Sequence, residues 1–365
     1  MLQEFASPGN STEVCTGEQT RTQPPPGAIV VDATGAYSGS YKTVAEGVAH
    51  IPNTTDEHTL FVFPGVYHEQ VVVPKLNGPL VLQGYTCDTM SYAANEVTIT
   101  QAKAQKDIPP EIKDNRNFLT TTLGFKSASG VKVYNLNVAN TAGKIEELAR
   151  RWLCMSTTRL RFLRLQLHRV PGHSVCSQGP RVSMAWFESC ELESVGEGWV
   201  TANGNKNGTI ASEYVFNKAR VFSSNDSMNG TTHLGRPWGE YARVVFQNSE
   251  LDDVVNLEGW APWDEETSTD NVYFKEFNNN GPERLLTSVW LTADSWMLLW
   301  TSRKSSVTTT SRNGGWTPTS LRSKIQVLNL LIVQATIQKL TYYNTSSPSS
   351  PLCCIYAYDK RNVVP

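Results

Sequence analysis

Short β-rich runs, each closed by Gly, Pro or Asn, follow one another from residue 28 to about residue 143. The runs are AIVVDA (28–33), TLFVFPG (59–65), QVVVPK (70–75), PLVLQGY (79–85), EVTITQA (96–102) and GVKVYNLNVAN (130–140). Strands without alternating helices argue against a doubly wound fold and leave a sandwich, a barrel or a β-solenoid. Val/Ile-rich rungs with Asn in the turns favour the solenoid, because stacked coils bury continuous apolar columns and leave the turns polar.

The same pattern sets the expected domain boundaries. One segment, residues 42–51, has apolar residues at helical spacing and predicts a single N-terminal helix. Residues 1–27 are polar and Pro-rich at their end, which indicates a flexible lead-in. The β-rich style resumes at residue 185 and continues to residue 283, so we expect one all-β domain over residues 28–283. The Ser/Thr-rich stretch 284–365 shows neither rungs nor a clear amphipathic helix and is interpreted as a tail of unknown structure.

Composition excludes several classes of protein. The chain has 365 residues, 39% hydrophobic, 18% charged and a net charge of −2, which describes a soluble globular protein without the basic excess of a nucleic-acid binder. It has no apolar run of membrane-spanning length. Seven cysteines without C-x-x-C pairs predict buried thiols plus one bridge rather than a metal site. Six N-glycosylation tripeptides favour export, although residues 1–28 lack the apolar core of a signal peptide.

The hexapeptide LGRPWG (234–239) is the strongest local signal for a site. Pro237 fixes its own φ and pushes Arg236 toward extended geometry, so a guanidinium and an indole can be held toward one surface. Arg236 can then bind a carboxylate, and Trp238 can stack on a sugar ring. On these residues alone, a surface turn that merely contains Arg and Trp remains an alternative.

Several motifs, taken in order, resemble carbohydrate-active pectin methylesterases of fungal type. They are PGVYHEQVVV (64–73), LQGY (82–85), NLNVANTAG (135–143), AWFESCELESVGEGWVTANG (185–204), LGRPWG (234–239) and EFNNNGP (276–282). The resemblance covers about residues 28–144 and 185–283. It implies a right-handed parallel β-helix with an open polar groove, a secreted monomer, and pectin (homogalacturonan) as its partner.

The resemblance also implies a reaction that needs no metal or cofactor. One aspartate attacks the methyl ester of galacturonate and a second donates a proton to the departing methoxide, which gives methanol and acidic pectin. Arg236 would hold the nucleophilic carboxylate, and Trp238 would form a sugar-binding wall. A looser alignment of FLTTTLGF makes Thr122 a substrate contact. The GxYxE pattern at residues 65–69 is read as a structural turn.

Residues 145–184 depart from this family. They hold seven arginines and no aspartate, and indeed no aspartate occurs between Asp114 and Asp226, so both catalytic carboxylates are missing. Read in shifted frames, residues 149–156 and 162–175 can encode the family-like strings QAVALYV and FYGCSFTEYQDTL. We therefore interpret this interval as frame-shifted or mis-spliced, and we expect it to loop out of the solenoid.

Two other functions stay open at this point. The first is a non-catalytic pectin-binding β-helix that keeps Arg236 and Trp238. The second is a β-helical lyase, which would need a calcium site, with Glu250, Asp252 and Asp253 as the nearest acidic cluster.

Overall fold

A computed structural model describes residues 15, 17–113, 116–126, 129–142, 151–156, 159–163, 166–168, 172–177, 184–264 and 268–281, with the backbone alone between 151 and 177. The chain divides into two units, Met1–Ser302 and Arg303–Pro365. The second unit and the predicted tail 284–365 lie outside the described residues. No helix among the described residues is long and apolar enough to span a bilayer.

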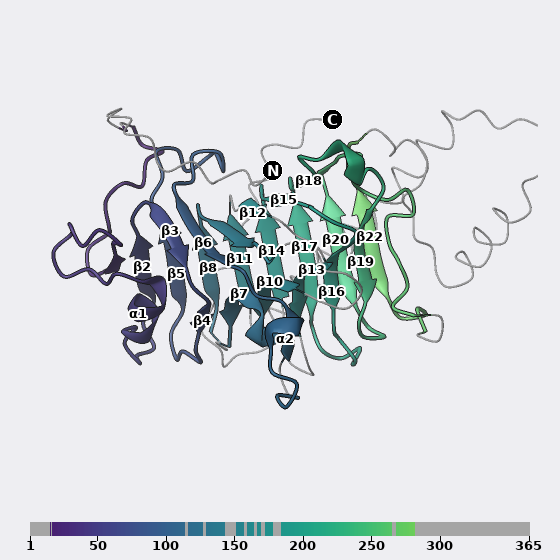
Figure 1. Ribbon diagram of the computed structural model, residues 1–365, viewed down its shortest axis with the longest axis horizontal. Coiled ribbons are helices and arrows are strands. Elements are labelled where there is room, and N and C mark those ends of the chain that lie inside the picture. The colour runs from purple at the N-terminus through teal and green to yellow at the C-terminus, as the bar shows by residue number, and fades with distance from the viewer. Residues whose placement is uncertain are drawn as a thin grey trace, which may run out of the picture. The chain divides into compact units, whose positions relative to one another are not determined.

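Three parallel sheets wind along the first unit (Figure 1). The nine-stranded sheet contains β1 Ile29–Val31, β2 His58–Val62, β5 Leu80–Gly84, β8 Val131–Tyr134, β11 Arg159–Leu163, β14 Met184–Glu188, β17 Glu213–Asn217, β20 Arg243–Gln247 and β22 Tyr273–Phe277. The six-stranded sheet contains β4 Val71–Val73, β7 Thr121–Phe125, β10 Arg151–Ser156, β13 Gly172–Ser177, β16 Gly198–Asn203 and β19 Thr232–Pro237. The seven-stranded sheet contains β3 Gly65–His68, β6 Val97–Gln101, β9 Asn137–Asn140, β12 Gln166–His168, β15 Glu191–Glu193, β18 Arg220–Phe222 and β21 Glu250–Leu251. Successive strands visit the three sheets in turn, which confirms the predicted parallel β-helix.

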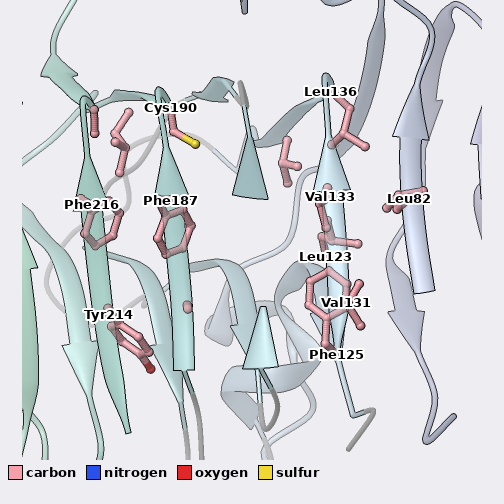
Figure 2. Close-up of a cluster of buried hydrophobic side chains, with 14 of the residues drawn as sticks. Leu82, Leu123, Phe125, Val131, Val133, Leu136, Phe187, Cys190, Tyr214 and Phe216 are labelled. Carbon is pink, nitrogen blue, oxygen red and sulfur yellow. The ribbon is translucent and has the colours of Figure 1, made fainter. Parts of the chain in front are cut away.

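Apolar side chains at matching positions of successive coils form the core, part of which is shown in Figure 2. Phe187, Phe216 and Phe246 are register partners on β14, β17 and β20. Their rings stack nearly parallel with centroids 4.3 Å apart in both pairs. All three are 0% exposed. This column confirms that stacked coils bury continuous apolar columns, although its members are Phe and not the Val and Ile of the predicted rungs.

The column ends at a buried carboxylate. The register partner of Phe246 on the next strand is Glu276, which is 6% exposed. Its carboxylate accepts from Trp260 Nε1 at 3.2 Å and from Asn279 Nδ2 at 3.4 Å. Trp260 in turn stacks on Phe274 at 4.3 Å. The last described strand thus replaces a ring with a hydrogen-bonded acid.

Left-handed residues close the turns after five strands. Among the described residues, the non-glycine positions with positive φ are Asn135, Ser189, Lys218, Asn248 and Asn278, at φ 49–52°. Asn tolerates this region because its short amide bonds locally. Asn248 Nδ2 donates to Asn217 Oδ1, and Asn278 Nδ2 donates to Asn248 Oδ1, both at 2.9 Å. The Asn-containing turns of the sequence are therefore a stacked polar ladder outside the core.

The predicted N-terminal helix is α1, Val44–Ala49, and the GxYxE pattern explains how it is held. The carboxylate of Glu69 accepts from the backbone N–H groups of Val44 and Ala45, both at 2.8 Å. Tyr67 is buried and donates to the Phe63 carbonyl at 2.9 Å, and burial raises its pKa to about 12. The motif is therefore structural, although residues 65–68 form strand β3 and not the expected turn. A short helix that was not predicted, α2 (Arg116–Leu119), precedes β7.

The expectation that residues 145–184 loop out is wrong for the parts that are described. Strands β10 to β13 pair in parallel with β7, β8 and β9 on one side and with β14, β15 and β16 on the other. Backbone N–H and C=O groups at each strand edge need partners whatever side chains the inserted segment carries. Leu160 and Phe162 also alternate in register with Val131 and Val133. Hydrogen bonding to the strands on either side therefore decides the backbone structure of this segment, despite its unusual composition.

Residues 17–27, expected to be flexible, are tied to the body of the solenoid. Arg21 and Thr86 exchange backbone hydrogen bonds of 2.9 and 3.1 Å, and Thr89 N donates to Gln19 O at 2.7 Å. A disulfide joins Cys15 to Cys87 just beyond this contact. The sequence could not reveal it, because pairing among seven cysteines depends on which coils lie side by side.

Candidate functional site

The LGRPWG segment forms the end of β19 and the turn that follows. Gly235 lies against β16, where a Cβ atom would overlap Thr201 Oγ1, and Gly239 lies against the Asn205 carbonyl. Trp238 N and Gly239 N both donate to Asn203 O, at 3.1 and 3.2 Å. The two glycines thus allow close backbone approach, and the segment is locked onto its neighbour strand.

The guanidinium of Arg236 lies between two indole rings. Its central carbon is 3.7 Å from the ring centroid of Trp199 on β16 and 4.2 Å from that of Trp263. Both distances are well inside the range for cation–π attraction. A guanidinium donates hydrogen bonds only in its own plane. Covering its faces therefore fixes the direction in which Arg236 can bind an anion.

Trp238 extends the same aromatic surface. Its ring stacks on Trp263 with centroids 5.7 Å apart and planes 8° from parallel. With Ala202 and Phe118 these two rings form a second apolar cluster, separate from the solenoid core. The structure thus brings the two predicted residues Arg236 and Trp238 together around Trp263.

Sequence reasoning missed Trp199 and Trp263. Trp199 lies in GWVTANG, which was noted only as a family motif, and Trp263 is the last residue of APW (261–263), between β21 and β22. Their proximity to Arg236 comes from strand stacking, which places residues about 30 positions apart side by side. The only sequence signal for these two residues was that the motifs GWVTANG and APW each contain a tryptophan.

His233 lies beside Trp199 and is a titratable member of this cluster. The two residues are register partners on β16 and β19, and their rings stack at 6.4 Å with a tilt of 22°. Burial lowers the pKa of His233 from its ordinary value, against the opposing influence of the Glu258 and Glu197 carboxylates. The imidazole is therefore biased toward its neutral form.

Thr122 is not brought to this surface. It is 0% exposed, and its hydroxyl donates to the Ala139 carbonyl at 3.0 Å across the corner between two sheets. The looser alignment gave the residue type but not the direction of the side chain, which the strand geometry turns inward. The structure therefore contradicts a direct substrate contact for Thr122.

A sequence model of the Pectinesterase family matches residues 185–296. A pectinesterase of Aspergillus niger is 35% identical over 288 residues, which cover 72% of this chain and 83% of that protein. A pectinesterase of Aspergillus aculeatus is 37% identical over 286 residues, with the same coverage of both chains. The chain belongs to the pectinesterase family.

The fold agrees with this membership. A crystal structure of an Aspergillus niger pectin methylesterase superposes with a TM-score of 0.57 and 25% identity, covering 80% of this chain and all of that one. The pectinesterase match also extends past residue 283, where the sequence pattern placed the end of the domain. The site described above lies within the matched part of this pectinesterase chain.

The acidic cluster considered for a calcium-dependent lyase has another partner in the pectinesterase fold. Arg220 Nη2 lies 2.8 Å from an Asp252 carboxylate oxygen, and Arg220 Nε lies 3.7 Å from Glu250. Arg220 Nη1 also lies 3.5 Å from Glu191. The guanidinium thus occupies the position at which these carboxylates converge. A cation there would have to displace Arg220, so the geometry gives the lyase hypothesis no support.

Among the described residues, one group of side chains has atoms close enough to share a metal ion. It comprises Cys15, Cys87 and Glu96. Both sulfurs are used by the disulfide, so they cannot act as thiolate ligands.

Proposed function

We propose that this chain hydrolyses the methyl esters of galacturonate in pectin, releasing methanol and leaving demethylated homogalacturonan. The observation that carries the proposal is the 35–37% identity to two fungal pectinesterases over 83% of their length. The aromatic and cationic cluster on β16 and β19 supports it, because a polymer of acidic sugars needs flat apolar surface and a fixed cation.

Each residue of the cluster has a role in this proposal. Trp238 offers a ring face on which a sugar packs, and Trp263 supports that ring from the other side. Arg236 directs its donors at a carboxylate, which is that of the attacking residue in the family chemistry or that of a free galacturonate unit. Thr122 takes no part, since it is buried and hydrogen-bonded inside the solenoid.

The proposal names no nucleophile, because the sequence contains no aspartate between Asp114 and Asp226. The pectinesterase chemistry implied by the resemblance places both acting carboxylates in that interval. Catalysis by this chain and binding by this chain are therefore separate claims, and each has its own measurement.

We also place the protein outside the cell, acting as a monomer on plant cell-wall pectin. The Cys15–Cys87 disulfide supports this, because such bonds persist in oxidising, extracellular environments. The glycosylation tripeptides at Asn53, Asn207, Asn225 and Asn229 support it too, since all four asparagines are exposed. Gel filtration of the secreted protein checks the monomeric state.

The decisive experiment uses the full chain with highly methylated pectin and a chelator. We expect binding of oligogalacturonate by calorimetry, and methanol release measured in parallel decides whether the bound pectin is also hydrolysed. Arg236→Gln should abolish methanol release and weaken binding, whereas Lys206→Gln, which removes an exposed cation from the loop after β16, should leave both unchanged. Binding without methanol would identify a non-catalytic pectin-binding protein. Absence of both would refute the proposal.

A further inference from the structure

Trp199 occupies a different place in the site from the other two tryptophans. It lies near the start of β16, and its register partner His233 lies beside it on β19. Trp263, by contrast, lies in the irregular segment after β21, and Trp238 lies at the turn that follows β19. Of the two indole rings that contact Arg236, that of Trp199 is the one carried by a regular strand.

The contacts of Trp199 show what its ring does. One face lies 3.7 Å from the central carbon of the Arg236 guanidinium. The ring also stacks on His233, with a centroid separation of 6.4 Å. An indole supported by a neighbouring ring cannot swing away without breaking that stack. The guanidinium can therefore not rotate toward β16, and Trp263 covers it at 4.2 Å.

We propose that Trp199 is a positioning residue that fixes the plane of Arg236, so that the arginine presents its donor edge to a carboxylate of the pectin site. The proposal deepens the proposed function and rests on it for the step that involves pectin. Trp199 itself need not touch the sugar. Trp199 limits the orientations of Arg236 before the ligand binds, so less side-chain entropy is lost on binding.

A first measurement tests the contact without any ligand. In a ¹H–¹⁵N spectrum the Nε–Hε signal of Arg236, assigned by its loss in Arg236→Lys, should be displaced by the ring currents of Trp199. Trp199→Leu should return it toward the position of an exposed arginine, and Trp199→Phe should retain most of the displacement. Trp186→Leu is the matched control, because Trp186 lies on β14 in another sheet. An Arg236 signal that is unchanged in Trp199→Leu would overturn the proposal.

A second measurement asks whether Trp199 acts through Arg236. Binding of a hexagalacturonate should weaken about ten-fold in Trp199→Leu, in line with loss of one desolvated cation–π contact. Trp199→Phe should recover most of that loss. In an Arg236→Gln background the Trp199→Leu change should have no further effect, because the residue it positions is gone. An equal loss in both backgrounds would contradict a positioning role.

The two measurements separate this proposal from the proposed function. A displaced Arg236 signal in a protein that neither binds hexagalacturonate nor releases methanol would refute the pectin function and leave the contact intact. Normal binding with additive effects and an undisplaced signal would refute positioning by Trp199 and leave the pectin function intact.

Discussion

At the scale of single residues, the site is a stack of flat groups. His233, Trp199, Arg236, Trp263 and Trp238 form a chain of ring–ring and cation–ring contacts, with separations of 3.7 to 6.4 Å. One member is a permanent cation and one is titratable. Burial lowers the pKa of His233, so the folded structure favours a neutral imidazole.

The stack predicts a stability change with pH. Because the pKa of His233 is lowered in the folded state, the unfolded chain binds the proton more readily. The contribution of this residue is complete above the unfolded pKa of about 6.5 and decreases as the pH falls from there toward the lower folded value. The urea midpoint of unfolding should fall from pH 7.5 to pH 5 in the native chain. This fall should be smaller in His233→Gln. An equal fall in both would contradict the assignment.

Sequence alone indicated some residues of the site and not others. Arg236 and Trp238 were accessible because both lie in one rigid hexapeptide. Trp199 and Trp263 were not, because their contact with Arg236 depends on which coil stacks on which. Thr122 was misplaced, since an alignment supplies a position along the strand but not the side of the sheet to which it points.

At the scale of elements, strands are held by columns of like side chains, and the Glu69 carboxylate links the start of helix α1 to the coils. The Phe187–Phe216–Phe246 column predicts that Phe216→Ala costs about 3–5 kcal/mol of unfolding free energy, because it removes a ring that is stacked on both faces. The neighbouring Val215→Ala, at a half-buried position of the same strand, should cost less than about 1 kcal/mol. Denaturant titration compares the two, and equal losses would argue against the column.

The helix cap gives a separate prediction. Glu69→Ala leaves the N–H groups of Val44 and Ala45 without their acceptor, and we expect a loss of about 1–2 kcal/mol. Glu111→Ala, an exposed acid in a loop, is the control and should be neutral within about 0.5 kcal/mol. Thermal unfolding followed by circular dichroism distinguishes them. A neutral Glu69→Ala would show that solvent satisfies these donors equally well.

Elements were the level that the sequence predicted best. Alternation and turn residues located most strands and helix α1, because these features depend on neighbours along the chain. Strands β10 to β13 were missed, because their side chains gave no clear alternation. What places them is the unpaired backbone of the coils on either side.

At the scale of the whole molecule, one covalent link joins the N-terminal segment to the coils. The Cys15–Cys87 bridge closes a separation of 72 residues, for which chain entropy predicts about 4 kcal/mol of stabilisation. Cys15→Ser should lower the melting temperature, and reductant should lower that of the native chain but not that of the variant. A native chain insensitive to reductant would show that the bridge does not contribute.

The direct pairing of β13 with β16, and of β11 with β14, bears on how such chains can vary in length. Each coil presents an equivalent edge of backbone donors and acceptors to the next coil. If one complete coil is lost, the two coils on either side can therefore pair with each other. Alleles or splice forms that differ by a whole coil would then be equally soluble and equally resistant to proteolysis. Only those that keep the coil with the two catalytic aspartates would be enzymes. For this architecture, expression and melting behaviour are poor guides to which forms are enzymes.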